Sequence, residues 1–355
     1  MNVLKNFLGI KNRKLNILIL GADGMLGYDV YSHFKRLSAL KDSIVGIVTG
    51  ITVADNIDFT IRHTLRSFMA DKVHYDWCIN CIAYTDTWKA EYDAQGKLNS
   101  YELNALAPKY IAESCNFRKT KLIHISTDYV FSELSCPGDD LLKVSSDKPF
   151  PKNIYGMHKL LGEMGIAEEF DNEKKWCCLR TSWLYGAHNN KSFIHKFMKN
   201  VGRACKKAQA KTDKVHVAVT SDEFSIPTST DCVIECIDKV IVQNRYGIAH
   251  AVSSVITVNP PSRLDFAREI LKCYSEPAVP DEYANKMFNY KLSDVVLDEV
   301  SLPDNAFYPK MSAMKETFPT RSWQSYLHAF MKEHKTEILD YAIKEIENEQ
   351  SSTKV

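Results

Sequence analysis

The sequence has no long hydrophobic run and almost no excess of charge of either sign. No apolar stretch approaches the roughly 18 residues that a membrane-spanning helix needs. The first residues include lysines but only a four-residue apolar patch, which is too short for the core of a secretory signal peptide. Lysine and arginine number 45 against 44 aspartates and glutamates, so a net charge of +1 attracts neither nucleic acid nor anionic lipid. These absences predict a cytoplasmic protein that binds no membrane and no nucleic acid.

The sequence also lacks a regular cysteine pattern. Its ten cysteines are irregularly spaced, and several lie inside apolar runs, so we expect buried thiols. Cys78 and Cys81 form a CxxC pair, which could indicate a metal or redox site. In a strand, however, residues three apart point to opposite faces, and no second ligand pair follows at zinc spacing. We therefore interpret the pair as core packing and predict no metal site.

Alternating apolar segments fill the first half of the chain of 355 residues. With 45% hydrophobic and 25% charged residues, the composition is typical of a globular enzyme with a large core. Strand-like runs alternate with helix-like stretches; the strand-like runs are 14–21, 43–48, 77–83, 120–127 and 176–186, and the helix-like stretches are 25–37, 101–115 and the residues from 153. This alternation predicts an α/β fold with a doubly wound, Rossmann-like parallel sheet.

A glycine turn follows the first predicted strand. Gly21, Gly24 and Gly27 form a GxxGxxG motif, which also contains Met25 and Leu26, at the junction of strand and helix. Glycines let the backbone approach phosphate oxygens, and the start of a helix offers free N–H groups and a positive dipole end. The alternative is a plain strand-to-helix turn, but the placement favours a dinucleotide site. No lysine follows in P-loop register, so we expect no nucleoside triphosphate site.

A hydroxyl, a phenol and an ammonium group follow in the second quarter of the chain. Thr127 ends the strand-like run 120–127, and Tyr155 and Lys159 lie four residues apart, on one face if their segment is helical. Strand ends on one edge of a parallel sheet form sites together. The pair Tyr31 and Lys35 has the same spacing but lies on the first helix, where we expect packing and solvent-facing roles.

These residue types suit the reduction of a ketone, which needs a hydride on carbon and a proton on oxygen. A phenol has a pKa of about 10 and is a poor acid at neutral pH, but a nearby ammonium lowers that pKa. The lysine can also hold a cofactor ribose, and a strand-end hydroxyl can orient the carbonyl. Each residue alone has a plainer interpretation: a packed tyrosine, a surface lysine, a capping threonine. Their combination downstream of a glycine turn favours catalysis.

Several segments together resemble those of the extended short-chain dehydrogenase/reductases, and among them the dTDP-4-dehydrorhamnose reductase family. The match runs in order from about residue 15 to 330, through the segments ILGADGMLG, INCIAYTDTWKAE, NALAP, ISTDYVF, NIYGMHKLLGE, LRTSWLYG and DEFSIPT. The resemblance implies an NAD(P)H-dependent reductase of the C4 ketone of a nucleotide-linked 4-keto-6-deoxy sugar. It favours NADPH, with NADH as the alternative, and it allows a homodimer.

The resemblance also implies roles for individual residues. The catalytic set would be Thr127, Tyr155 and Lys159. The cofactor would be lined by the glycine turn, by Tyr155 and Lys159, and by Ala83, Tyr84 and Thr85. The sugar would be flanked by Asp128, Tyr129, Arg180 and Trp183.

The domain boundaries that we expect follow from the pattern of strand-like and helix-like segments and from the family resemblance. A basic extension, 1–14, precedes a dinucleotide-binding domain, 15–186. Residues 187–330 would form mainly a smaller α+β substrate-binding domain, interleaved with the first, and 331–355 a charged C-terminal helix and tail. A turn-rich loop is expected at 275–285.

Two departures bear on specificity. The family usually shows Arg-Pro-x-Asn-Ser near the C-terminus, where this chain has Leu302-Pro303-Asp304-Asn305-Ala306, so a substrate contact is missing unless Lys291 or Lys310 replaces it. The second strand ends in GIVTGITVADN, with no immediate acid for a ribose 2′-hydroxyl and no arginine for a 2′-phosphate. The preferred sugar nucleotide is therefore expected to differ from the family's eponymous one, and cofactor choice stays open.

Three other functions compete with the reductase. Sugar-nucleotide dehydratases typically have an Asp-Glu pair after the threonine. Here Tyr129 follows Asp128, and a phenol is a poor base at neutral pH. Epimerase/reductases typically have a cysteine in the loop after the third strand. The corresponding segment here, YTDTWKAE, has no cysteine. A non-catalytic, NADP-binding regulatory subunit, like the β subunit of methionine adenosyltransferase, resembles the same family. The intact Thr127, Tyr155 and Lys159 favour catalysis over that third alternative.

Overall fold

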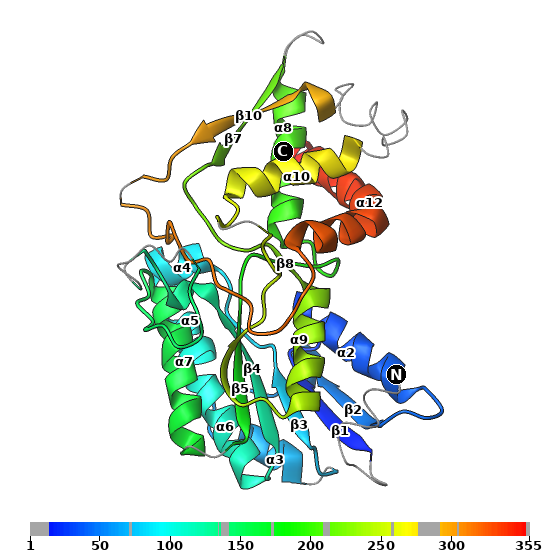
Figure 1. The fold of residues 1–355 in the computed structure, drawn as a ribbon, viewed down its shortest axis with the longest axis vertical. Coiled ribbons are helices and arrows are strands. Elements are labelled where there is room, and N and C mark those ends of the chain that lie inside the picture. Colours follow the sequence, from blue (N-terminus) through cyan, green and yellow to red (C-terminus); the bar gives the residue numbers. More distant parts are fainter. Residues whose placement is uncertain are drawn as a thin grey trace.

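A six-stranded parallel sheet forms the centre of the larger half of the molecule (Figure 1). The computed structural model describes residues 14–352 apart from 71–72, 134, 136–141, 172–173, 209–213, 257–258, 276–291 and 304, so the predicted extension before residue 14, most of the predicted loop at 275–285, and Lys291 lie outside the described residues. The strand order is β2-β1-β3-β4-β5-β9, and every neighbouring pair is parallel. The strands are β1 (Leu15–Leu20), β2 (Val45–Ile51), β3 (Trp77–Asn80), β4 (Lys121–Thr127), β5 (Trp176–Thr181) and β9 (Gly247–His250). The predicted doubly wound α/β fold is confirmed.

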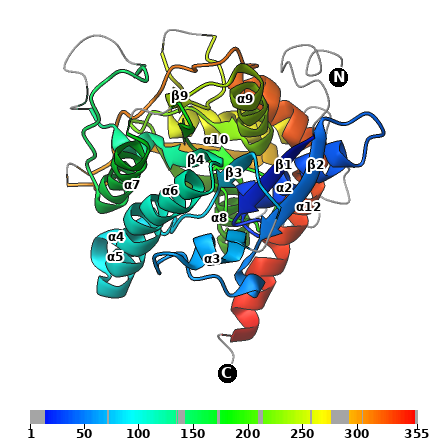
Figure 2. The same ribbon diagram turned by 90° about the horizontal axis from the view of Figure 1, so that it is seen from below.

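Helices cover both faces of this sheet because its strands are apolar on both sides. One face packs against α2 (Met25–Ser38) and α9 (Thr230–Gln243), and the other against α3 (Thr64–Ala70), α6 (Ala107–Phe117) and α7 (Ile154–Phe170). Figure 2 shows α9 and α3 on opposite sides of the strands. Cys78 packs into the second of these cores and Cys81 against the first, so the expected opposite orientation of the CxxC pair is confirmed.

The chain reverses direction across the sheet between β1 and β3, and in open parallel sheets a binding crevice is expected at the carboxyl ends beside such a point. The backbone N–H of Gly21 donates to Ile51 O of β2 at 2.9 Å, and Cys81 N–H donates to Leu20 O at 3.0 Å. The glycine turn and the loop after β3 therefore flank the same crevice. On α2, Tyr31 packs against the core and Lys35 is exposed, as expected for that pair.

The helix predicted at 101–115 is interrupted by one wide turn. Helix α5 (Ala94–Tyr101) leads into a π-helical turn, η2 (Glu102–Leu106), and then into α6. The amide of Asn104 in this turn accepts from Tyr84 N–H at 3.0 Å and donates to Tyr84 O at 2.9 Å. A π-turn thus holds the loop that follows β3, a placement typical of functional sites.

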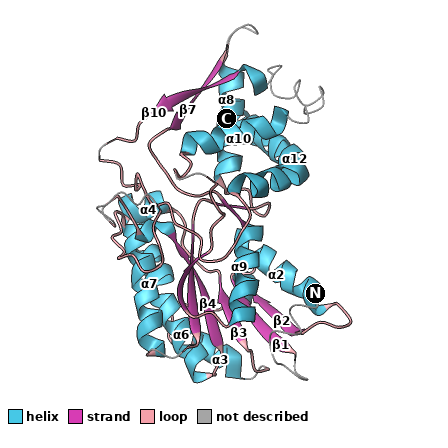
Figure 3. Cartoon of the chain, in the orientation of Figure 1, coloured by secondary structure: helices cyan, strands magenta, loops and turns pink. Residues whose placement is uncertain are grey.

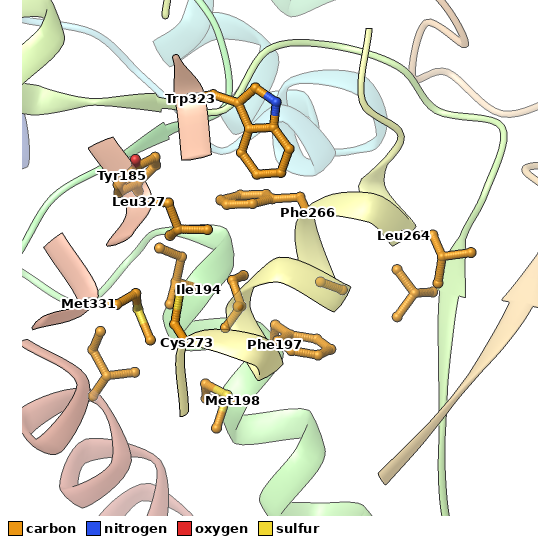
Figure 4. Packing of buried hydrophobic residues seen from close by; sticks show 14 of the residues in the cluster. Tyr185, Ile194, Phe197, Met198, Leu264, Phe266, Cys273, Trp323, Leu327 and Met331 are labelled. Atoms are coloured by element: carbon orange, nitrogen blue, oxygen red, sulfur yellow. The ribbon is translucent and has the colours of Figure 1, made fainter. Parts of the chain in front are cut away.

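The smaller half has its own core, shown in Figure 4. It is built from α8 (Phe193–Lys207), α10 (Arg263–Ser275), α12 (Trp323–Ser352) and a parallel pair, β7 (Val215–Thr220) and β10 (Val295–Val300), and Figure 3 shows its helices beside that pair. A second short pair, β6 (Leu184–Tyr185) and β8 (Thr228–Ser229), lies between the halves. The remaining elements are α4 (Thr87–Tyr92) and the 3₁₀ turns η1 (Val53–Asp55), η3 (Asp128–Val130) and η4 (Leu292–Asp294).

The C-terminal helix begins earlier than the sequence predicted. Charge rises after residue 331, but α12 starts at Trp323, because Ser322 accepts the Ser325 N–H at 3.2 Å and so caps the helix. Leu327, Met331 and Ile338 of this helix are buried in the smaller core. The helix therefore crosses the predicted boundary at 330/331. Within the residues that the structure describes, no helix is long and apolar enough to cross a membrane.

Replacing Gly27 by alanine should destabilise the protein. A Cβ at Gly27 would lie 1.9 Å from Gly21 O, so the turn and α2 would have to separate. We expect the free energy of unfolding to fall by at least about 2 kcal/mol, as for an overpacked core. Gly24→Ala is the matched control, because its Cβ would meet only Gly21 O, at 3.3 Å, and its φ is −77°. Urea unfolding of both variants checks this; equal stabilities would show that the contact is easily relieved.

Candidate active site

The glycine turn lies between β1 and the start of α2, where the sequence predicts a pyrophosphate. Gly21 has a φ of +76°, and Gly24, with extended backbone, caps α2, so the helix begins at Met25. The first N–H groups of a helix have no intrahelical acceptor. With the Asn189 amide in the orientation that satisfies both of its ends, its oxygen accepts from Met25 N–H at 3.2 Å. The first N–H group of the helix is therefore already bonded to an oxygen atom. The side chain of Leu26 is buried in the core, which leaves only its backbone for a cofactor.

Two carboxylates lie at the end of β2, where the adenosine ribose of a dinucleotide would be expected. Asp23 accepts from Val53 N–H at 3.2 Å. Asp55 accepts from Thr52 N–H at 2.8 Å and from its hydroxyl at 3.0 Å. Sequence inspection found no acid immediately at this strand end and missed Asp23, because it comes from the glycine turn.

The loop predicted to line the cofactor follows β3. Ala83 and Tyr84 are partly buried and Thr85 is exposed. A Cβ at Gly21 would lie 3.2 Å from the Ile82 side chain, so this loop and the glycine turn are in close contact. The loop therefore lies beside the turn, and the role of its three residues in lining a cofactor stays a prediction.

Thr127 and Tyr155 meet at the carboxyl end of β4. Helix α7 starts after Asn153, whose side chain accepts from Gly156 N–H at 2.7 Å. A Cβ at Gly156 would lie 2.1 Å from Tyr129 O, so a glycine there lets the helix approach β4 closely. Hydrogen bonding with Thr127 lowers the pKa of the Tyr155 phenol, so these two side chains lie close together although they are distant in the sequence.

The electrostatics of Tyr155 differ from the expectation. Burial raises its pKa, the charge of Asp128 raises it further, and the bond with Thr127 lowers it. Lys159, which was expected to lower this pKa, instead donates to Ile125 O at 2.7 Å. The ammonium is therefore directed at the backbone of β4, and in this arrangement the phenol keeps its proton.

A buried polar chain extends from Lys159 into the sheet. Its Nζ lies 3.2 Å from Nε2 of His124, and Nδ1 of His124 lies 2.9 Å from the Asn80 amide nitrogen. Burial lowers the pKa of Lys159 to about 8, opposed by the charge of Glu163. Burial and then Lys159 hold the pKa of His124 well below its usual value. Sequence analysis missed His124 and Asn80, although a histidine inside the apolar run LIHIST was a signal.

Asp128 joins the two halves of the molecule rather than facing a sugar. Its carboxylate is 2% exposed and accepts from the hydroxyls of Ser225 and Ser312 at 2.7 Å each and from Thr127 at 3.1 Å. Burial raises its pKa to about 6, against these three hydrogen bonds. The predicted sugar contact is thus corrected, because protein hydroxyls surround the carboxylate. No local sequence signal marks Ser225 and Ser312.

Arg180 also lies in the interior instead of beside a sugar. Its guanidinium makes two bonds to the carboxylate of Glu163, at 3.0 and 2.7 Å, and both side chains are 3% exposed. The reason is its position on β5, inside the sheet, where a charge must be paired. Trp183 and Tyr129 are only partly buried. The Arg263 guanidinium stacks on Trp183 at 3.5 Å from the ring centroid.

Comparison with curated proteins gives relatives with related names. A probable dTDP-4,6-dihydroxy-2-methyloxan-3-one 4-ketoreductase of Streptomyces antibioticus is 28% identical over 257 residues, 72% of this chain and 76% of the relative. A dTDP-4-dehydrorhamnose reductase of Mycolicibacterium smegmatis is 29% identical over 253 residues, 71% of this chain and 67% of the relative.

Comparison with solved structures agrees. A dTDP-4-dehydrorhamnose reductase of Clostridium acetobutylicum has a TM-score of 0.69 and 27% identity, covering 90% of this chain and 99% of that one. A structure from Bacillus anthracis in complex with NADP shares the fold, with a TM-score of 0.69 and 24% identity, over 90% of this chain and 99% of that one. The sequence model described as the RmlD substrate binding domain matches residues 15–336. The chain, with this match over most of its length and with the sheet and crevice described above, belongs to the RmlD substrate binding domain family.

Proposed function

We propose that this protein is an NADPH-dependent reductase of the C4 ketone of a nucleotide-linked 4-keto-6-deoxy sugar. The observation that carries the proposal is the proximity of Thr127 and Tyr155 at the carboxyl end of β4, on the edge of the sheet that also holds the glycine turn. Relatives named as ketoreductases of dTDP-linked sugars support the substrate class.

Each residue of the pair has a defined task in this reaction. NADPH, when bound, supplies the hydride. Tyr155, whose raised pKa keeps it protonated, donates its proton to the carbonyl oxygen as negative charge develops there. The Thr127 hydroxyl, once it turns its single hydrogen from Asp128 to the substrate, donates a hydrogen bond that holds the same oxygen in place. The Lys159 ammonium donates to Ile125 O of β4 at 2.7 Å and supplies a positive charge on the same helix, one turn after Tyr155.

The choice of NADPH comes from the family resemblance, and the site itself leaves NADH as an alternative. Asp23 and Asp55 bring negative charge to the end of β2, which suits the hydroxyls of a ribose better than a 2′-phosphate. A cytoplasmic location and a homodimer stay predictions. Separate binding titrations with NADPH and NADH decide which cofactor the protein prefers.

The experiment that tests the function is a substrate panel. Purified protein is mixed with NADPH and with dTDP-, UDP-, GDP- or CDP-linked 4-keto-6-deoxy sugars, and absorbance of the reduced cofactor is followed. Consumption with at least one sugar is expected. Cofactor binding without consumption of any of them would instead favour the regulatory-subunit alternative.

We further expect the dTDP-linked rhamnose precursor not to be the best substrate of this panel. Leu302 stands where the family has an arginine, and its backbone N–H donates to Asp222 at 2.7 Å. A charge-assisted hydrogen bond is worth roughly 1.5–3 kcal/mol, so its loss weakens binding. Lys310, which could compensate, lies 3.2 Å from the Asp222 carboxylate. A kcat/KM clearly highest for the dTDP-linked precursor would contradict this.

Tyr155→Phe should lower kcat by about 10² to 10⁴, the usual contribution of a positioned proton donor. NADPH should still bind, because only one oxygen atom is removed. Tyr31→Phe is the matched control: it has a lysine four residues on, but lies on α2, and should leave kcat near that of the native protein. Near-normal turnover by Tyr155→Phe would remove this residue from the mechanism.

The pH dependence should show the charge of Lys159. This group is protonated below a pKa of about 8 and loses its charge above it, while the raised pKa keeps Tyr155 protonated throughout. The kcat/KM should therefore be level near pH 7 and fall as the pH rises through about 8. NADPH affinity measured over the same range separates a binding effect from a chemical one. A kcat/KM that stays level to pH 9.5 would show that this charge is not needed.

A further inference from the structure

Six aromatic rings contact one another in an unbroken series from the surface to Tyr155. Successive ring centroids are 4.0 to 6.3 Å apart. The outer two, on α4, are 57% and 60% exposed. In order from the surface, the aromatic series is Trp88, Tyr92, Phe307, Tyr308, Tyr129 and Tyr155.

Hydrogen bonds fix the outer part of this series to the start of α7. Glu91, on α4, accepts from Ile154 N–H at 2.9 Å. Asn153, which caps α7, donates to Phe307 O at 3.1 Å. The outer rings are therefore tied to the turn of helix that carries Tyr155, and their positions relative to the reacting phenol are set by direct bonds.

Two lysines, each paired with a carboxylate, lie along the same rim. Lys152 Nζ is 2.9 Å from the carboxylate of Glu133, and the same carboxylate accepts from Lys310 N–H at 3.3 Å. Lys152 precedes Asn153, and Lys310 follows Tyr308 by two residues. The Lys310 ammonium lies 3.2 Å from the Asp222 carboxylate. A diphosphate between a sugar at Tyr155 and a ring at the surface would thus pass two ammonium groups that each already have a carboxylate partner, in a segment that lacks the family's arginine.

A solvent-exposed tryptophan and tyrosine side by side at the rim of a site are the residues that stack flat rings. A nucleobase is the flat ring that the proposed substrate contains. The adenosine end of a dinucleotide lies instead toward β2, beyond the glycine turn. Resting on the proposed function, we infer that Trp88 and Tyr92, backed by Phe307, form the subsite that stacks the nucleobase of the nucleotide-linked sugar while its ketone lies at Tyr155.

Substitution of Trp88 tests this subsite. Trp88→Leu removes the π-face and should raise the KM for the nucleotide-linked sugar, and the Kd for the matching nucleoside diphosphate, about tenfold, with kcat changed less than about twofold. Trp88→Phe keeps an aromatic face and should recover most of the affinity. Phe117→Leu is the control, because Phe117 is 56% exposed at the end of α6, near the amino edge of the strands, and should change neither quantity.

Calorimetric titration with dTDP, UDP, GDP and CDP separates the subsite from the reductase activity, since no ketone is involved. Binding that Trp88→Leu weakens, without reduction of any sugar, would support the subsite while the proposed function fails. Should Trp88→Leu fail to fold by circular dichroism, Tyr92→Leu takes its place. Unchanged KM and Kd in a folded variant would overturn the inference, and a lost dimer with unchanged nucleotide binding would assign the rings to a protein contact.

Discussion

The carboxylate of Asp128 is the interaction on which the arrangement of the site depends. It collects hydroxyl hydrogens from β4 itself, from the segment before β8 and from the segment before α12, through Thr127, Ser225 and Ser312. A buried carboxylate is costly unless it is fully hydrogen-bonded, so these segments can reach their native positions only together. The bond from Thr127 also orients its hydroxyl beside Tyr155. One charge therefore sets both the junction of the two halves and the position of Thr127 in the proposed reacting pair.

Three side chains on one face of α7 explain how buried charges are stabilised beside the proposed site. Tyr155, Lys159 and Glu163 follow one another at intervals of four residues and face the same side of the helix. Glu163 pairs with Arg180 of β5 at 2.7 Å, and its charge favours the ammonium form of Lys159. Removing one partner of such a buried pair typically costs about 3–5 kcal/mol. The ion pair thus holds the helix in register with the sheet, which keeps Tyr155 at the end of β4.

The site also requires close contact between backbone segments, and glycines permit this contact at three places. Gly27 lets α2 begin directly above Gly21, and Gly156 lets α7 begin directly beside Tyr129 O. A third, Gly162, faces Asn104 O, where an added Cβ would lie at 2.3 Å. Through Asn104 this contact also reaches the loop at Tyr84. The loop after β3, Tyr155 and the glycine turn are therefore positioned by backbone packing more than by long side chains.

The sequence by itself determined the local features that depend on short-range chemistry. Apolar runs and helical spacing predicted the parallel sheet, the glycine turn after β1, Thr127 at a strand end, and Tyr155 with Lys159 on one helix, because periodicity and steric limits act between near neighbours. Only the tertiary structure decided which polar groups are buried. Asp128 and Arg180 were expected at the sugar but lie inside, and Lys159 bonds to β4, because their partners come from segments up to 184 residues away. The start of α12 at Trp323 was set by a serine cap and by core contacts, which the charge pattern does not show. Contacts between distant segments leave no mark on local spacing.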